Sequence, residues 1–340
     1  VTFKYAWYVG STLVATTPTL TGVSFDKGDV IEVEVTPTDG VDDGTAVTSA
    51  TVTVDNTAPV VSSVVLTPSK AGTDTTLSAT VTASDVDGDS LTYSYAWYVD
   101  GSKVSATGST LDGTVWFDKG ETVYVEVSAD DGDDSSTVVS SAVVTIGNSP
   151  PSITSATISP TTVYEATTLT CTPAGWSDPD GDSAGYTYRW TVNGAPSATT
   201  TTLTGASFKK GDTIGCRVTP FDGTDSGTPV SAATVKVLNT APVLSSVSLS
   251  TLTPSETDTI TVTLGSASDA DGDSISYTYA WYVNGKLVAS STTLDGTYFG
   301  SGDTIYVEVT PDDGTDDGTA VRSATATVSN TAPVISSVTL

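Results

Sequence analysis

The stretch Thr92-Tyr-Ser-Tyr-Ala-Trp-Tyr-Val-Asp-Gly101 decides the fold of this 340-residue chain. Its side chains fit a period of two, which places Trp97 on one face and its neighbour Tyr98 on the other. Asp100-Gly101 is a signal for a tight hairpin turn. The stretch therefore predicts a β-strand that turns back into a hairpin.

The same stretch recurs along the chain around Trp7, Trp97, Trp190 and Trp281. An Asn-x-x-Pro pattern begins at Asn56, Asn148, Asn239 and Asn330, at spacings of 92, 91 and 91 residues. A fixed period is typical of arrays in which each unit mainly contacts its neighbours. We therefore divide the chain into a partial module at 1–58, modules at 59–150, 151–241 and 242–332, and the first strand of a further module at 333–340. We expect the whole chain to be a segment of a longer array.

Within residues 59–150, apolar residues alternate with polar ones in short runs separated by turn signals. The expected strands include 60–66, 77–81, 93–99, 123–127 and 138–146, and no window favours a helix of useful length. About seven such strands indicate a two-sheet Greek-key sandwich. The predicted fold class is all-β, a tandem array of Ig-like β-sandwich modules of about 91 residues joined by short Asn-x-x-Pro linkers.

Charge and composition narrow the classes of function. The chain has 40 acidic and 12 basic residues and a net charge of −28, which argues against nucleic acid as a partner and favours cations. It has no run of 18 apolar residues, so we predict no membrane insertion in this stretch. Histidine is absent, and the serines lack an activating base at a known spacing, so we do not expect an enzyme.

The strongest chemical signal is a loop with acids at alternate positions and a glycine before the last one. Carboxylates about 5 Å apart repel by about 3 kcal/mol per pair at an effective dielectric constant of 20. Calcium binds six to eight oxygen ligands and would offset this repulsion, whereas plain solvated Asp-Gly turns are the alternative. The predicted calcium ligands in these loops are Asp85, Asp87, Asp89, Asp178, Asp180, Asp182, Asp269, Asp271 and Asp273.

A second acidic loop follows in each module, before the last strand. In an Ig-like sandwich both loops emerge at the end where the chain enters, so acids of both loops and the linker should converge at each module junction. A solvated acidic turn explains this loop equally well. The predicted calcium ligands here are Asp131, Asp133, Asp222, Asp225, Asp313 and Asp316.

The combination of Asp-x-Asp-Gly-Asp, Tyr-x-Tyr-x-Trp-Tyr-Val-Asn/Asp-Gly and Asn-x-x-Pro resembles the cadherin-like, PKD-like and bacterial Ig-like repeats of large secreted or surface proteins. The resemblance implies an extracellular or cell-surface location and calcium shared between modules. Asp87 would match the first ligand group, and Asp118, Glu121 and Glu165 would match ligands from the preceding module. Three of the four linkers lack an acid, so we expect one ion held mostly by the two loops.

Cys171 and Cys216 both point into the predicted core of one module, with Trp190 between them in the sequence. This order resembles the immunoglobulin inter-sheet disulfide, which implies that the two cysteines are bonded in an oxidising compartment. The bond would contribute about 4 kcal/mol in the chain-entropy model. Two buried free thiols are the alternative.

Together these features predict an extracellular structural repeat protein that forms a stalk, fibre or filament, stiffened by calcium at or near the junctions. Its partners would be its own neighbouring modules, or further copies in a homopolymer. The alternative is an adhesin or lectin-like region that recognises a glycan or another cell, sought first in the third module. The recurring tryptophans favour core packing over a glycan platform. Trp116 and Trp176 do not recur and are the better candidates for exposed contact.

Overall fold

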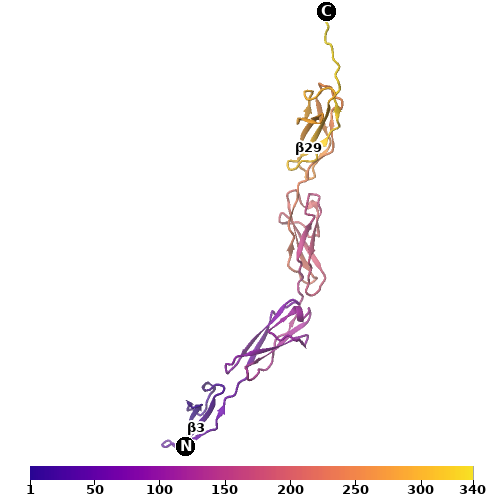
Figure 1. Cartoon of the computed structure of the whole chain (residues 1–340). Coiled ribbons are helices and arrows are strands. Elements are labelled where there is room, and N and C mark those ends of the chain that lie inside the picture. The colour runs from indigo at the N-terminus through magenta and orange to yellow at the C-terminus, as the bar shows by residue number, and fades with distance from the viewer. Residues whose placement is uncertain (340) are drawn as a thin grey trace. The chain divides into compact units, whose positions relative to one another are not determined.

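The computed structural model describes residues 1–339, and its elements are β-strands apart from three short helical turns (Figure 1). Contacts divide the chain into two compact units. The first unit comprises Val1–Pro151 with the loops Ser177–Ser183 and Asp222–Asp225, and the second comprises Ser152–Trp176, Ala184–Phe221 and Ser226–Leu340. No helix within residues 1–339 has both the length and the apolar character that crossing a membrane needs.

In the first unit, residues 1–58 form a single antiparallel sheet with the strand order β2-β1-β3-β4, in which β5 also pairs with β3. No residue of this segment is fully buried, as expected for one layer of a sandwich. Its elements are β1 (Thr2–Val9), β2 (Thr12–Ala15), η1 (Gly22–Ser24), β3 (Val30–Thr38), β4 (Val47–Thr48) and β5 (Val52–Thr53).

The first unit also contains a complete sandwich of two antiparallel sheets, which we call the second sandwich. One sheet has the order β10-β7-β6, and the other has the order β12-β11-β8-β9 with β13 also on β11. The elements are β6 (Val60–Thr67), β7 (Thr76–Ser84), β8 (Thr92–Val99), β9 (Ser102–Lys103), β10 (Thr110–Asp112), α1 (Gly113–Trp116), β11 (Thr122–Asp130), β12 (Val139–Ser140) and β13 (Val144–Thr145).

The third sandwich lies in the second unit and repeats this topology, with sheets β14-β15-β18 and β17-β16-β19-β20, and β21 on β19. Its elements are β14 (Ser155–Ser159), β15 (Leu169–Ala174), β16 (Gly185–Val192), β17 (Ala195–Pro196), β18 (Thr202–Leu203), η2 (Gly205–Ser207), β19 (Thr213–Phe221), β20 (Val230–Ser231) and β21 (Val235–Lys236).

The fourth sandwich, also in the second unit, has sheets β23-β24-β28 and β27-β26-β29-β30, with β31 on β29, and a further pair β22-β25. Strands β3 and β29, both labelled in Figure 1, occupy the same place in the first and the last large sheets. The elements are β22 (Val243–Leu244), β23 (Val247–Leu249), β24 (Ile260–Leu264), β25 (Ala267–Ser268), β26 (Ser276–Val283), β27 (Lys286–Ala289), β28 (Thr293–Leu294), β29 (Thr304–Asp312), β30 (Val321–Arg322) and β31 (Ala326–Thr327).

These sheets confirm the predicted fold class, an all-β tandem array of Ig-like sandwiches. The predicted hairpin turn is present too, because Asp100 and Gly101 both have positive φ, at 45° and 74°, as a type I′ turn requires. A parallel bridge between Ala71 and Ile146 links the chain after β6 to the end of the other sheet. The same parallel bridge joins Val163 to Val237 and Ser255 to Ser329.

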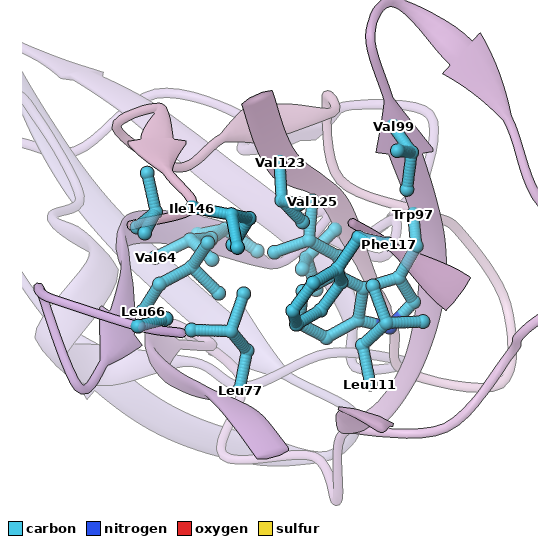
Figure 2. Packing of buried hydrophobic residues seen from close by; sticks show 14 of the residues in the cluster. Val64, Leu66, Leu77, Trp97, Val99, Leu111, Phe117, Val123, Val125 and Ile146 are labelled. Atoms are coloured by element: carbon cyan, nitrogen blue, oxygen red, sulfur yellow. The ribbon is translucent and has the colours of Figure 1, made fainter. Parts of the chain in front are cut away.

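A tryptophan at the centre of each complete sandwich organises the core. Trp97, Trp190 and Trp281 are fully buried, and each Nε1 donates a hydrogen bond of 2.8 to 2.9 Å to a backbone carbonyl. Figure 2 shows Trp97 among the aliphatic side chains that fill the space between the sheets of the second sandwich. The tryptophans of the three complete sandwiches are therefore core residues rather than a glycan platform.

Trp116 and Trp176 are less available than the sequence suggested. Both are half-buried and pack against the cores of their sandwiches. Trp176 also meets Tyr186 edge to face, with ring centroids 5.6 Å apart. Neither is a free aromatic surface.

The predicted strand at 138–146 is two short strands in the structure, β12 and β13. At the break, the Ser141 hydroxyl accepts a hydrogen bond from the backbone N–H of Val125 at 3.1 Å, so a side chain replaces one bond of the ladder. Ser323 does the same for Val307 in the fourth sandwich. Residues 333–339 form no strand, and Leu340 lies outside the described residues, so the strand at 333–340 stays a prediction.

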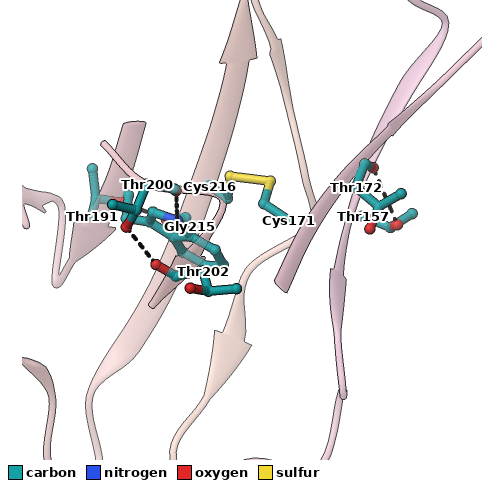
Figure 3. The surroundings of a disulfide bond; sticks show 9 residues. Thr157, Cys171, Thr172, Thr191, Thr200, Thr202, Gly215 and Cys216 are labelled. Atoms are coloured by element: carbon teal, nitrogen blue, oxygen red, sulfur yellow. Dashed lines mark hydrogen bonds between the residues drawn. A yellow bond between two sulfur atoms is a disulfide. The ribbon is translucent and has the colours of Figure 1, made fainter. Parts of the chain in front are cut away.

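Cys171 on β15 and Cys216 on β19 form a disulfide that joins the two sheets of the third sandwich (Figure 3). Both cysteines are buried, and Cys216 is the cross-strand partner of Trp190. The bond spans 45 residues. The disulfide is confirmed, and the alternative of two free thiols is wrong.

Candidate cation sites at the junctions

Three of the four Asn-x-x-Pro linkers each meet two acidic loops, and we call each such place a junction. The first junction combines Asn56 with the loops 85–89 and 130–134, and the second combines Asn148 with the loops 178–182 and 222–225. Both lie within the first unit. The third junction combines Asn239 with the loops 269–273 and 312–317, within the second unit.

The first aspartate of each Asp-x-Asp-Gly-Asp loop organises the backbone of that loop. Oδ1 of Asp85 accepts hydrogen bonds from the N–H groups of Asp87 at 2.8 Å and Asp89 at 3.2 Å. Asp178 and Asp269 make the same pair of bonds in their loops. Gly88 has a φ of 80°, which explains why glycine precedes the last acid.

The other oxygen of this first aspartate has no partner. Oδ2 of Asp85, of Asp178 and of Asp269 is buried and accepts no hydrogen bond from the described residues. A buried acceptor without a partner is costly, and an ionised one is costlier. The same orphaned oxygen in all three loops is a candidate cation ligand.

The second aspartate of the loop holds the linker. Oδ2 of Asp87 accepts the backbone N–H of Thr57 at 2.7 Å. Asp180 accepts from Ser149, and Asp271 accepts from Thr240, each at 2.6 Å. The residue after each linker asparagine is therefore tied to the loop by a charge-assisted hydrogen bond.

The third aspartate of each loop forms an ion pair with a lysine of the preceding module. This lysine lies in the turn just before β3, β11 or β19. Lys27 Nζ lies 2.8 Å from Asp89 and 2.6 Å from Asp133, so it joins both loops of the first junction. Lys119 lies 2.6 Å from Asp182, and Lys210 pairs with Asp273. The bonds to Asp133 and then Asp89 raise the pKa of Lys27 above its ordinary value.

The linker asparagine binds the second acidic loop. Nδ2 of Asn56 donates to Asp131 and Asp134, each at 3.0 Å. The backbone N–H of Asp134 and then the Asn56 amide lower the pKa of Asp131 to about 2. Asn148 donates in the same way to Asp222 and Asp225, and Asn239 to Asp313 and Asp316.

The amide oxygen of the asparagine distinguishes the junctions. Oδ1 of Asn56 and of Asn239 is buried without a partner in the described residues. Oδ1 of Asn148 instead accepts a hydrogen bond from Lys119 Nζ at 2.7 Å. The first and third junctions thus each contain two orphaned oxygens, whereas the second contains one, because the Lys119 ammonium donates to the asparagine oxygen there.

The structure brings together part of the predicted ligand set. Potential ligand atoms lie within 4.8 Å of one another in three groups: Asp85, Asp87 and Asp89; Asp178, Asp182 and Asp222; and Asp269, Asp271 and Asp273. The remaining predicted ligands, Asp131, Asp133, Asp180, Asp225, Asp313 and Asp316, belong to no such group and bind the linker, a lysine or a backbone group instead.

The glutamates that the cadherin-like resemblance offered from the preceding module bind backbone groups of their own module instead. Glu121 accepts the backbone N–H of Asp118 at 2.7 Å, and Glu165 accepts that of Lys210 at 2.7 Å. Among the described residues, neither glutamate forms a hydrogen bond or ion pair with an Asp-x-Asp-Gly-Asp loop. Asp180 instead accepts a hydrogen bond from the Thr73 hydroxyl of the second sandwich.

Sequence reasoning missed Lys27, Lys119 and Lys210. It treated the repulsion among the acids as uncompensated, whereas each junction has one ammonium group among them. The signal was the lysine before the glycine of a recurring turn, present three times and replaced by Ser301 in the fourth sandwich.

The donor atoms still suit a hard cation. All are carboxylate or amide oxygens, which are the ligands calcium prefers. At the first junction the loop 85–89 has three acids against the single positive charge of Lys27. Two buried oxygens there accept no hydrogen bond from residues 1–339. The residues therefore fit calcium, provided that the ion shares the cluster with the lysine.

No protein-family model matches the chain. No curated protein matches it either. Solved structures with a similar arrangement include a Ca²⁺-stabilized adhesin that helps an Antarctic bacterium to bind ice, with 16% identity, 97% of this chain and 90% of that chain covered and a TM-score of 0.28. Domains A168–A170 of titin give 11% identity, 81% and 99% coverage and a TM-score of 0.32.

Three N-terminal domains of the highly immunogenic outer capsid protein of bacteriophage RB49 give 18% identity, coverage of 81% of this chain and all of that chain, and a TM-score of 0.27. The Ig-like fold is defined by the strands and sheets of the chain itself.

Proposed function

We propose that the chain is a structural segment of an extracellular or cell-surface repeat protein, in which Ig-like modules join end to end into a stalk, fibre or filament. The modules are residues 59–150, 151–241 and 242–332, flanked by the partial modules 1–58 and 333–340. The observation that carries the proposal is the threefold recurrence of one set of contacts at the linkers. Contacts that recur at three successive linkers are typical of a structure that restrains the linker conformation.

The contacts hold each linker from both sides. At the first junction, Asp131 and Asp134 bind the Asn56 side chain, while Asp87 binds the next backbone N–H. Lys27 crosses from its own turn to both acidic loops. A linker that is restrained at both its side chain and its backbone has few conformations left. The range of angles that the two modules can adopt is therefore smaller.

Calcium is the second part of the proposal. Asp85, Asp178 and Asp269 would contribute their orphaned oxygens, with the neighbouring loop acids completing each site and with Asn56 and Asn239 adding amide oxygens. The bound ion would supply positive charge where carboxylates crowd, and thereby stiffen the junction. In this respect the modules would act like cadherin-like and PKD-like repeats.

The extracellular location is supported by the disulfide. Disulfides persist in oxidising compartments and are rare in the cytosol. The Cys171–Cys216 bond lies in the core of the third sandwich, which is consistent with a structural rather than a redox-active role.

A calcium titration of the chain tests the stiffening. Small-angle scattering should show a larger maximum dimension, and calorimetry a higher melting temperature, as calcium rises to about 1 mM, the range of weak extracellular sites. Replacing Asp85, Asp178 and Asp269 by Asn keeps an oxygen acceptor for the loop and removes the charge, so this variant should lose the response. Indifference of the wild-type chain to both calcium and EDTA would refute the calcium part and leave a metal-free array.

A second function, recognition of a glycan or another cell, is favoured by one observation. Arg189 and Arg217 lie exposed on the third sandwich and make no ion pair with the described residues, in a chain of net charge −28.

A further inference from the structure

Two arginines lie opposite each other on the outer face of the third sandwich. Arg189 on β16 is the cross-strand partner of Arg217 on β19, and both side chains are exposed. Residues at such positions have Cβ atoms about 5 Å apart, and like charges placed there repel. No hydrogen bond or ion pair of either side chain occurs among residues 1–339, so the pair has no internal counterion.

The same register in the other sheets carries a different pair. It is Ala6 opposite Glu34, Ala96 opposite Glu126, and Ala280 opposite Glu308. At this register the third sandwich therefore has two arginines where the other sheets have one alanine and one glutamate. The framework does not need this exchange, because the other sheets form without it.

The surface beside the arginines is hollow. The next outward pair is Thr191 opposite Gly215, where Thr191 donates a hydrogen bond of 3.5 Å to the Gly215 carbonyl (Figure 3). The second and fourth sandwiches fill this place with stacked tyrosines, Tyr98 on Tyr124 with centroids 4.7 Å apart, and Tyr282 on Tyr306 at 4.8 Å. Without those rings, the third sandwich has open space.

The arginine pair separates two adjoining hollows, of 850 and 230 Å³, and belongs to the wall of both. Hydroxyl groups share the lining with apolar residues: Thr187 and Thr219 lie in the larger hollow beside Pro196 and Ala198, and Thr191 lies in the smaller one. Paired guanidinium groups bind a carboxylate with two parallel hydrogen bonds, and hydroxyls bind other hydroxyls. The lining thus suits a ligand with one acidic group and several hydroxyls.

We infer that this face of the third sandwich binds a carboxylated sugar at the end of a glycan, with Arg189 and Arg217 on the carboxylate. A singly charged sugar fits better than a polyanion, because the net charge of −28 repels a chain of negative charges. A second copy of the chain fits less well, because its loop acids already bind asparagine, lysine or backbone groups. The site rests on the second function proposed above and is independent of the junctions.

The test measures binding of the whole chain to an oligosaccharide that ends in glucuronic acid, with the same oligosaccharide ending in glucose as the comparison. Only the acidic form should bind. The double variant Arg189→Ala with Arg217→Glu restores the pair found in the other sheets, so it should fold, and its affinity should fall at least about tenfold, the scale of a lost charge-assisted hydrogen bond.

A second variant closes the hollow and keeps the charges. Thr191→Tyr with Gly215→Tyr introduces the pair of the second and fourth sandwiches, and should also lower affinity. Arg322→Ala removes the remaining arginine of the chain, which stacks on Tyr306 in the fourth sandwich, and should leave binding unchanged.

Each contrary result has a distinct meaning. Binding that survives in the Arg189/Arg217 variant would overturn this site and leave glycan recognition elsewhere on the chain. No binding by the wild-type chain, or equal binding of both sugars, would overturn the carboxylated-sugar site. Sedimentation that shows self-association dependent on the two arginines, with no sugar bound, would assign the face to a second copy instead.

Discussion

The third and fourth sandwiches share one framework and differ in two layers. In the core, the Cys171–Cys216 bond occupies the positions of Val262 and Val307. On the outer face, arginines and a hollow replace the Ala–Glu pair and the stacked tyrosines. The framework, with its buried tryptophan and its junction contacts, is unchanged by either exchange. Core cross-linking and surface chemistry can therefore both change while the framework is kept.

The fourth sandwich has a single arginine, Arg322, and its surroundings differ from those of the two arginines of the third sandwich. The Arg322 guanidinium lies 3.4 Å above the centre of the Tyr306 ring, which stacks in turn on Tyr282. At the equivalent register the third sandwich has Ser231, paired with Arg217. The fourth sandwich thus engages its arginine internally, whereas the third leaves two arginines free for solvent or ligand.

The largest difference should appear when the third sandwich receives the core of the fourth. Replacing Cys171 and Cys216 by Val removes a cross-link over 45 residues, and should lower the unfolding free energy of that sandwich by about 4 kcal/mol, within a range of about 2 to 5. Calorimetry with resolved transitions measures this. A reducing agent should reproduce the loss in the wild-type chain and have no effect on the variant. An unshifted third-sandwich transition would contradict the account.

An intermediate effect should follow from giving the fourth sandwich the outer face of the third. Tyr282→Thr with Tyr306→Gly removes the aromatic stack and the contact of Arg322, and should cost about 1 to 2 kcal/mol. Denaturant unfolding of this sandwich measures the change. As a control, Arg322→Ala alone should cost less. A double variant as stable as the wild type would show that the stack has no structural value.

The smallest effect is expected from the lysines at the second and third junctions, which precede the third and fourth sandwiches. Lys119 bonds to Asn148 and Asp182, whereas Lys210 pairs with Asp273, so Lys119→Met should lower the melting temperature more than Lys210→Met. Both losses should shrink at high salt. Equal losses, or losses that persist in high salt, would show that the lysines act through packing.

The pH dependence of these lysines provides a control. Their partners raise the pKa of both above the ordinary 10.5, with Asp182 as the main cause for Lys119 and Asp273 for Lys210. The stabilisation is therefore complete below pH 10.5 and is lost as the pH rises through the folded-state pKa. The difference between wild type and either variant should accordingly vanish in alkali.

The sequence predicted features that depend on local pattern. The alternation around Trp97, the Asp100-Gly101 turn and the period of the linkers specify strands, hairpins and repeats, because each is encoded within a few residues. The disulfide could be predicted from the sequence for a related reason. The register of two strands placed both cysteines inward, and the tryptophan between them supplied the resemblance.

Features that depend on distant partners were not accessible in the same way. Lys27 is 62 residues from Asp89, and nothing short of the folded loops brings them together. The sequence marked Asn56 as part of a linker but not as the donor to Asp131 and Asp134. The arginine pair likewise required the exact cross-strand register, since Arg189 and Arg217 are 28 positions apart in the chain.

The parallel bridge between Ala71 and Ile146 has a mechanical consequence. Because these first and last segments run in the same direction, the chain enters the second sandwich at one end and leaves it at the other. Tension applied through the termini would slide the two segments past each other and load the bond from the Gly147 N–H to the Ala71 carbonyl in shear. Bonds loaded together in shear resist rupture better than bonds peeled one at a time, so this parallel pairing should resist a pull along the chain better than an antiparallel hairpin would.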